Sequence, residues 1–367
     1  MTEKPLSGIK VLELGQLMAG PFAGTLLAYF GADVIKIEPP GRGDAVRGWR
    51  AITGDTSLWW YSLGRNKRSV TVNLKSDGGR EIIRRLAGEV DVLIENFRPG
   101  TLENWGLGPD ELQAINPGLI IARVSGYGQD GPYSSRPGYA SVCEGVGGLR
   151  YVNGFPGQPP VRQNLSLGDS LTGLHTAFGI LLSLFHRNQQ EVRTGQIVDV
   201  GIFEAVYNMM EAVVPEYDRM GMIREPSGTT ITGVVPTNTY PCKDDKYVII
   251  GGNGDSIFKR LMNTAGRPDM ADDPELTDNA GRLRHQERVD GAIADWTRTL
   301  TAAEVLEVLE EARVPAGLIY SVVDMVNDPH FKARGLYEEV EAGGEPLKLP
   351  AIVPKLSKTP GKTEWAG

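Results

Sequence analysis

The chain of 367 residues has few of the side chains that bind metals or form disulfides, with only two cysteines and four histidines. Cys143 and Cys242 lie far apart in the sequence, and neither belongs to a CxxC or Cys/His motif. This scarcity excludes a disulfide-stabilised scaffold and predicts that the protein has no metal site. Both cysteines are expected to be small buried residues, as in proteins of a reducing cytoplasm.

The common signatures of nucleotide and hydrolase sites are also missing. No GxGxxG follows the first expected strand, and the chain has no GxxxxGK[ST], GxSxG or HExxH motif. These absences argue against conventional dinucleotide, P-loop, serine-hydrolase and zinc-protease chemistry.

Long apolar runs are absent as well. No run reaches the length of a membrane span, and Met1–Pro5 lacks the charged-then-apolar order of a signal peptide. A net charge of −8 argues against a nucleic-acid partner. We therefore expect a cytoplasmic protein with no membrane partner and no nucleic-acid partner.

What the sequence does contain is an alternation of short β-branched runs with helical segments over about the first 130 residues. Strands are expected over 11–14, 34–37, 69–74, 90–94 and 120–125, and helices over 21–30 and 77–87. This alternation predicts an α/β fold with a mostly parallel sheet, whose ligand site lies beyond the carboxyl ends of the strands. Residues 170–186 predict an apolar helix buried between layers, and 202–213 a further helix.

The composition changes after this region. Residues 216–236 are rich in Met, Gly, Pro and Thr, which is typical of a linker. We expect a large domain that begins with 1–215, a smaller α+β domain over 237–316, and a segment over 317–367 that returns to the large domain.

Two short segments are candidates for chemistry. Asp169, between Gly168 and Ser170, stands where an extended run meets the long apolar helix, so it is either a helix cap or a nucleophilic carboxylate held ionised by the helix dipole. Local sequence alone favours the cap. Lys67 and Arg68 open a strand, where an ammonium and a guanidinium could grip a phosphate.

Seven segments, taken in order, resemble the class III coenzyme A transferases (CaiB/BaiF type), the family of formyl-CoA transferase and carnitine CoA-transferase. The resemblance runs from Leu6 to about Pro360. The segments are Leu6–Glu13, Ala19–Pro21, Gly31–Glu38, Asn66–Ser69, Glu95–Gly100, Gly126–Gln129 and Gly168–Asp169.

The resemblance implies a Rossmann-like large domain built from both chain ends, a smaller α+β domain, and two ring-shaped protomers interlocked as a homodimer. It implies that Asp169 is the nucleophile, which forms an acyl-aspartyl anhydride and then an aspartyl-CoA thioester. It also implies that a CoA thioester is the substrate and that no cofactor is bound permanently. Asp169 is then catalytic, whereas its local sequence alone favoured a cap.

The remaining site residues are assigned by the same resemblance. Met18 and Ala19 present backbone groups near the reacting carbonyl. The CoA-binding positions are Val72, Lys75, Asn96, Phe97, Arg98, Arg136 and Tyr139. Arg47 and Trp49 lie in a segment similar to the branch that transfers CoA from succinyl-CoA to dicarboxylates, and Arg47 is the candidate partner of the distal carboxylate.

Several departures from the family pattern leave alternatives open. Pro39 and Asn104 replace arginines that formyl-CoA transferases use. Ala140 stands where many members have Asp or Glu, so any contribution of that acid must come from elsewhere, with Glu144 as the candidate. The histidine base of the racemase branch is missing near Gly138. The alternatives are an acyl-CoA racemase or isomerase of the same fold, and a CoA-binding module without catalysis.

Overall fold

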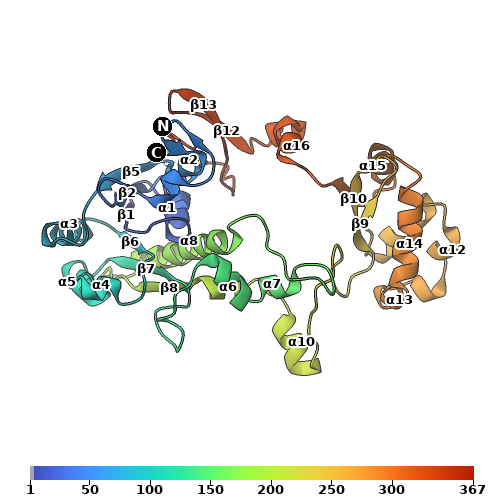
Figure 1. Cartoon of the computed structure of the whole chain (residues 1–367), viewed down its shortest axis with the longest axis horizontal. Coiled ribbons are helices and arrows are strands. Elements are labelled where there is room, and N and C mark those ends of the chain that lie inside the picture. Colours follow the sequence, from blue (N-terminus) through green and yellow to red (C-terminus); the bar gives the residue numbers. More distant parts are fainter. Residues whose placement is uncertain (1–3) are drawn as a thin grey trace. The chain divides into compact units, whose positions relative to one another are not determined.

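The computed structural model describes residues 4–367 (Figure 1). Its internal contacts divide the chain into two compact units. Unit 1 contains residues 4–150, 162–215 and 329–367, and unit 2 contains 151–161 and 216–328. The expected linker and small domain both fall in unit 2, together with 151–161 and 317–328, which the sequence analysis had placed elsewhere. The domain boundaries stay a prediction.

A six-stranded sheet forms the centre of unit 1. Its strands are β1 (Lys10–Glu13), β2 (Asp33–Glu38), β5 (Lys67–Thr71), β6 (Val92–Glu95), β7 (Ile120–Ser125) and β8 (Ile197–Gly201). All neighbouring pairs are parallel, in the order β5-β2-β1-β6-β7-β8. The strand order therefore reverses between β1 and β6, which is the switch point where ligands bind in open α/β sheets. The predicted α/β fold with a parallel sheet is confirmed.

Helices cover both faces of this sheet (Figure 1). The helices of unit 1 are α1 (Ala19–Tyr29), α2 (Leu58–Gly64), α3 (Asp77–Ala87), α4 (Thr101–Asn104), α5 (Pro109–Ile115), α6 (Ala140–Val146), α8 (Leu167–Asn188), α9 (Ile202–Tyr207) and α17 (Pro329–Ala333), with the short 3-10 helix η1 (Ala45–Gly48). Val92 and Ile94 pack with α1 and α8, whereas Leu93 between them packs with α3, α4 and α5. Successive side chains of a strand thus point to opposite faces of the sheet, and each strand contributes to the hydrophobic core on both faces.

The long helix α8 begins earlier and ends later than predicted, and only one of its faces is covered. Thr172, Ile180 and Leu184 are buried against the sheet and α1. On the opposite face Phe178 and Phe185 are 59% and 67% exposed. The prediction that the helix is buried all round is therefore wrong for the single chain.

The helix predicted over 202–213 is also shorter than expected. It ends at Tyr207, and a separate helix α10 (Val213–Met220) follows. Between them Glu211 has a φ of 50°, in the left-handed region that interrupts a helix. No glycine or proline marks this break, so helical propensity alone could not locate it.

Beneath the carboxyl ends of β1 and β2 lies a buried network of four charged side chains, which we call the ion network: Glu13, Lys36, Asp44 and Lys67. The Lys36 ammonium lies 3.0 Å from Glu13 and 2.9 Å from Asp44, and the Lys67 ammonium lies 2.8 Å from Glu13. All four side chains are at most 1% exposed. Two positive and two negative charges make the ion network neutral, which limits the cost of its burial.

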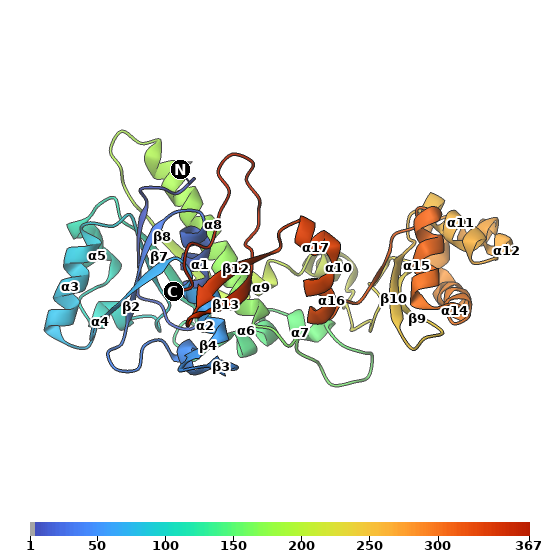
Figure 2. The same ribbon diagram turned by 90° about the horizontal axis from the view of Figure 1, so that it is seen from above.

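The last residues of the chain complete the edge of this sheet. Glu364 and Trp365 donate their backbone N–H groups to the side-chain oxygen of Asn66, and the Trp365 indole donates to the Lys67 carbonyl. Figure 2 shows the hairpin of β12 (Tyr337–Ala342) and β13 (Glu345–Pro350) beside α2. Unit 1 also contains the two-stranded ribbon of β3 (Ile52–Thr53) and β4 (Thr56–Ser57).

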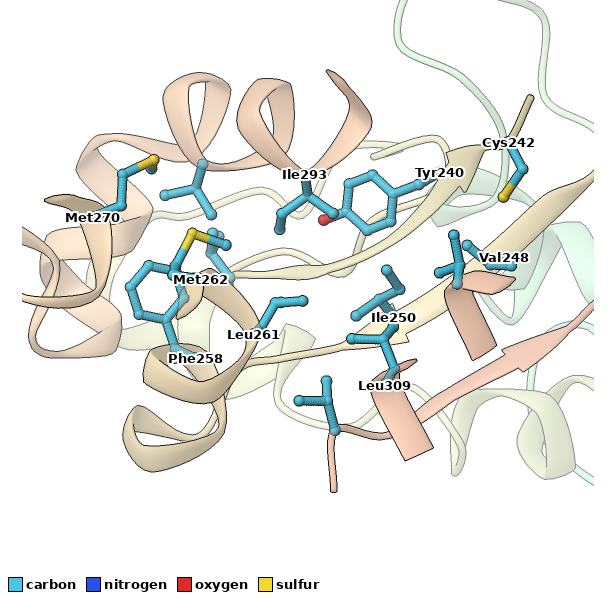
Figure 3. Close-up of a cluster of buried hydrophobic side chains, with 14 of the residues drawn as sticks. Tyr240, Cys242, Val248, Ile250, Phe258, Leu261, Met262, Met270, Ile293 and Leu309 are labelled. Atoms are coloured by element: carbon cyan, nitrogen blue, oxygen red, sulfur yellow. The ribbon is translucent and has the colours of Figure 1, made fainter. Parts of the chain in front are cut away.

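Unit 2 is built on a three-stranded antiparallel sheet in the order β11-β10-β9. Its elements are β9 (Thr237–Pro241), β10 (Tyr247–Gly251), β11 (Ala316–Leu318), α11 (Asp255–Thr264), α12 (Pro268–Ala271), η2 (Pro274–Leu276), α13 (Asn279–Arg284), α14 (Gln286–Thr297), α15 (Ala302–Glu311) and α16 (Val322–Asn327), while α7 (Leu149–Val152) and α10 cross the unit boundaries. Figure 3 shows Val248 and Ile250 of β10 against Leu261 and Leu309 of the covering helices.

Within residues 4–367, no helix combines the length and the apolar character that crossing a membrane requires.

The ion network yields a stability prediction. Replacing Lys36 by Met should destabilise unit 1 by about 3–5 kcal/mol, because Asp44 and Glu13 would remain buried without a cation between them. Chemical denaturation monitored by tryptophan fluorescence measures the loss. As a control, Lys259→Met breaks an ion pair whose partners are 59% and 68% exposed and should cost less than about 1 kcal/mol. Equal losses of stability in Lys36→Met and Lys259→Met would contradict the stabilising role given to the ion network.

Candidate active site

A hollow of about 250 Å³ lies in unit 1 at the switch point of the sheet. The loops after β1, β6 and β7 and the first turn of α8 supply its walls. The predicted site residues along it are Met18, Ala19, Asn96, Phe97, Arg98, Arg136, Tyr139 and Asp169. The structure therefore brings together eight positions that are spread over about 150 residues of sequence.

The loop after β1 is held in an unusual conformation. Leu17 has a φ of 66°, a left-handed conformation that costs energy for a residue with a side chain. Its N–H donates to both carboxylate oxygens of Asp44, each at 3.1 Å. Since Asp44 is itself bound to Lys36 in the ion network, the buried charges fix the backbone of this loop.

Asn96 ties the loop after β6 to the loop after β1. Its side-chain oxygen accepts from the Gln16 N–H at 2.8 Å, and its amide group donates to the Gln16 carbonyl at 2.7 Å. The predicted CoA-binding position Asn96 thus also joins the two loops across the switch point.

The first turn of α1 presents free N–H groups at this hollow. Met18 is the N-cap, and Pro21, as the third helical residue, has no N–H to satisfy. Among residues 4–367, the N–H groups of Ala19 and Gly20 have no acceptor. Helix α8 approaches this turn closely at Gly173, where an added Cβ would lie 2.9 Å from the Ala19 carbonyl oxygen.

Asp169 lies in the first turn of α8 and lines the hollow. Burial raises the pKa of Asp169 to about 6, and the neighbouring Glu144 carboxylate adds to the rise, whereas Arg162 opposes it. At neutral pH the carboxylate is still ionised, but it is poorly solvated and therefore reactive.

Glu144 of α6 is buried beside Asp169 and fully bonded. One oxygen accepts the Gly168 N–H at 3.1 Å, and the other lies 3.2 Å from Arg162 and 3.4 Å from Arg150. Cys143, next to it, is a buried free cysteine, and burial raises the pKa of its thiol to about 11. Cys143 is therefore a neutral thiol, and Cys242 is also buried, as predicted.

Two guanidinium groups at the hollow have no carboxylate partner in the described part of the chain. These are Arg98, in the loop after β6, and Arg136, which lies 3.5 Å over the Tyr133 ring. Tyr139 beside them is 71% exposed. The hollow therefore combines one carboxylate with two available cations, an arrangement that fits an anionic ligand with a reactive carbonyl.

The other predicted CoA positions, Val72 and Lys75, line an adjoining hollow of about 190 Å³. Gln16 and Phe97 border both hollows, so the two lie next to each other along the edge of the sheet. Arg42 also lines the second hollow. The sequence analysis missed it, although it follows Pro39, where a family arginine is lost.

Three predicted cations are engaged elsewhere. Arg47 forms a two-bond pair with Glu38, at 2.8 and 2.7 Å, and stacks over Trp60. Neither Arg47 nor Trp49 lines either hollow, and their assignment to the acceptor acid stays a prediction. The expectation that Lys67 and Arg68 grip a phosphate is wrong, because Lys67 is buried against Glu13 and Arg68 pairs with Asp33.

Asp44 is the main residue that sequence reasoning missed. It stands in a glycine-rich loop, and only the three-dimensional fold brings it to Leu17 and Lys36. Within residues 4–367, no cluster of three or more His, Cys, Asp or Glu side chains could hold a metal ion.

Known proteins are similar to this chain over nearly its whole length. The model of CoA-transferase family III matches residues 6–367. The chain is 47% identical to the succinyl-CoA–D-citramalate CoA-transferase of Chloroflexus aurantiacus, over 99% of this chain and 90% of that protein. It is 42% identical to the α subunit of the succinyl-CoA–L-malate CoA-transferase of Chloroflexus aurantiacus, over 99% and 85%. A crystal structure of a CaiB/BaiF family protein from Brucella suis is similar, with a TM-score of 0.86 and 31% identity over 99% of this chain and 95% of that one.

The raised pKa of Asp169 predicts a pH-dependent stability. The neutral form of Asp169 contributes to the free energy of unfolding. This contribution is fully present below the ordinary carboxyl pKa of 3.8 and is lost as pH rises through about 6, because the folded protein must then ionise a poorly solvated group. Asp169→Asn should therefore be more stable than the natural chain at pH 7, by an amount on the order of 2 kcal/mol, and equal to it near pH 4.

Denaturation at both pH values measures this difference. The matched change Asp55→Asn, at an exposed carboxylate between β3 and β4, should show no difference between the two pH values. An Asp169→Asn variant that is less stable than the natural chain at pH 7 would contradict a half-buried carboxylate with a raised pKa.

Proposed function

The chain belongs to CoA-transferase family III, as the sequence resemblance predicted, and we propose that it moves CoA from succinyl-CoA to a free dicarboxylic acid through covalent intermediates on Asp169. The observation that carries the proposal is the hollow that joins a half-buried carboxylate, two unpaired guanidinium groups and the free N–H groups of α1. The choice of donor and acceptor class rests on the relatives that act on citramalate and malate.

In the proposed reaction an Asp169 oxygen attacks the thioester carbonyl of succinyl-CoA, and the carbon–sulfur bond breaks to release the CoA thiolate. The thiolate then attacks the Asp169 carbonyl of the resulting anhydride, which frees succinate and leaves an aspartyl-CoA thioester. The acceptor carboxylate attacks this thioester and releases the thiolate again. The thiolate finally attacks the acyl group of the new anhydride, giving acceptor-CoA and free Asp169.

The first turn of α1 is suited to stabilise the oxyanions of these steps. Each attack places negative charge on a carbonyl oxygen, and the free N–H groups of Ala19 and Gly20 are oriented donors at a helix N-terminus. The clamp of Asp44 on Leu17 keeps these donors in place before the substrate arrives.

We assign the two neighbouring hollows to the two ends of one CoA molecule. We assign the adenosine end to the hollow of Val72 and Lys75, where Arg42 and Lys75 supply positive charge. We assign the phosphates and pantetheine to the neighbourhood of Arg98, Arg136 and Tyr139, which lead to Asp169.

For the acceptor we propose a four- or five-carbon dicarboxylate, with Arg47 and Trp49 near its distal end. A distal carboxylate needs a cation, because an unpaired buried charge is costly. Arg47 is paired with Glu38 in this chain, so the acceptor carboxylate would have to share Arg47 with Glu38 or displace Glu38 from it.

We further propose that the chain works as an interlocked homodimer in the cytoplasm. The support is the apolar face of α8, whose exposed members are Leu174, Phe178, Leu181, Leu182 and Phe185. With Leu6, Leu26 and Phe30 part of this face lines an apolar groove of about 340 Å³, and an apolar surface of this kind marks a protein contact. The two buried free thiols suit a reducing compartment.

Incubation with succinyl-CoA and a panel of carboxylic acids tests the reaction. We expect new CoA thioesters from citramalate, malate and other dicarboxylates, detected by mass spectrometry, and much less from monocarboxylates. Asp169→Asn should lower the rate by a factor on the order of 10⁴ or more, because a covalent nucleophile has no substitute. Hydroxylamine should trap a modified Asp169 only in the natural chain, and a fully active Asp169→Asn variant would overturn the proposal.

The assembly is tested by dilution. If two chains are threaded through each other, mass photometry at nanomolar concentration should detect no folded species at the monomer mass of 39.8 kDa, because separation requires unfolding. Phe178→Glu, which places a charge in the apolar face, should give aggregated or unfolded chains. A reversible, folded monomer from either chain would contradict the interlocked dimer.

A further inference from the structure

Glu144 is a buried carboxylate that the proposed reaction does not use. Its side chain is 1% exposed, although it lies on α6 immediately behind the nucleophile. Its partners come from three segments: Gly168 from the first turn of α8, Arg162 from the loop that precedes α8, and Arg150 from α7. A carboxylate is rarely buried to this extent without a function for its charge.

The bond to Gly168 replaces a missing helix cap. Ser166, the N-cap of α8, makes no side-chain bond to the first turn, so that turn lacks a local acceptor. Glu144 supplies the acceptor from α6, at 3.1 Å from the Gly168 nitrogen. Gly168 is needed for this approach, because an added Cβ would lie 3.0 Å from the Cγ of Glu144. The residue before Asp169 is therefore fixed by Glu144.

The charges that face Asp169 are few. Glu144 and the neutral thiol of Cys143 face it from α6, and Arg162 faces it from the preceding loop. Helix α1 has no charged side chain. Arg98, Arg136 and Tyr139 line the same hollow. The charged groups of the other elements packed on α8 have their own partners: Arg123 with Glu95 and Glu103, Asp199 with the Gln129 N–H, and Glu204 with the Gly201 N–H.

We propose that Glu144 is a positioning residue for Asp169, which it holds in place through Gly168 and whose ionisation it controls together with Arg162. Glu144 contributes a negative charge that favours the neutral acid, and Arg162 contributes a positive charge that favours the carboxylate. The two charges together set the pKa of Asp169. If the pKa were much lower, Asp169 would be a stable and unreactive anion, and if it were much higher, Asp169 would be a neutral acid that cannot attack. This inference rests on the proposed role of Asp169, but it can be measured without turnover.

The experiment follows the ionisation of Asp169 directly in the resting protein. Carboxyl ¹³C signals are recorded against pH in protein labelled at aspartate, and the signal missing from Asp169→Asn identifies the residue. In Glu144→Gln the amide oxygen can still accept from Gly168, but the negative charge is gone. In Arg162→Gln, at a side chain that is 40% exposed, the positive charge is gone.

The two variants should move the titration in opposite directions. We expect the midpoint of Asp169 to fall by about one pH unit in Glu144→Gln and to rise by a similar amount in Arg162→Gln. The matched control Glu304→Gln changes a carboxylate that caps Thr301 in unit 2 and should leave the midpoint unchanged. The acid limb of kcat/KM should shift in parallel with each midpoint.

The positioning role is tested by Glu144→Asp. This variant keeps the charge but is too short to reach Gly168, so the midpoint should stay within about half a unit while kcat falls at least about tenfold with KM little changed. If Glu144→Gln does not fold, Arg150→Gln replaces it: removing this partner of Glu144 leaves its charge less neutralised, and the midpoint should rise.

Unchanged midpoints in the folded Glu144 and Arg162 variants would overturn the electrostatic part of the inference, and an unchanged kcat in Glu144→Asp would overturn the positioning part. The proposed function fails separately, through absence of CoA transfer in the natural chain, which leaves the titration data interpretable.

Discussion

The hollow at the switch point of the sheet depends on one interaction, the ion pair between the buried Lys36 ammonium and the Asp44 carboxylate. Asp44 holds the Leu17 N–H, Leu17 takes up a left-handed conformation, and the first turn of α1 then presents its N–H groups. A neutral polar residue could bond the same N–H, but a carboxylate also forms an ion pair with Lys36 of β2, which holds Asp44 in place. Burying these charges costs free energy, but it holds the backbone at Leu17 in a single conformation.

The same constraint couples the two ends of the site. Asp44 donates its N–H to Glu38, which is bonded by Arg47 and Ser69 at the rim of the second hollow. Burial opposes ionisation of Glu38, yet its bonds with Arg47, Ser69 and the Asp44 N–H lower its pKa to about 2. The loop 38–47 therefore links the loop after β1, which borders the first hollow, with Glu38, which lines the second, through largely buried charges.

The parallel sheet could be predicted from the sequence, because strand periodicity is a local signal. The residues that line the hollow were named from the resemblance to the family, which periodicity alone could not have supplied. Eight of the residues named from sequence line one cavity. What the sequence could not predict are pairings that depend on distance in space. Lys67 looked like an exposed phosphate ligand until the fold placed it against Glu13, and Asp44 carried no motif. The exposed face of α8 was expected to be part of the core, because an apolar face that packs inside a domain has the same sequence pattern as one that packs against another chain.

The position of the C-terminal segment has a consequence for synthesis. Asn66 and Lys67, at the start of β5, are bonded by residues 364 and 365, which are translated after every strand of the sheet. Most of unit 2, by contrast, comes from the continuous stretch 216–328 and is complete earlier. During synthesis all six strands of the sheet therefore emerge before the segment that bonds the start of β5, and this edge keeps unpaired polar groups until residues 364 and 365 have been made.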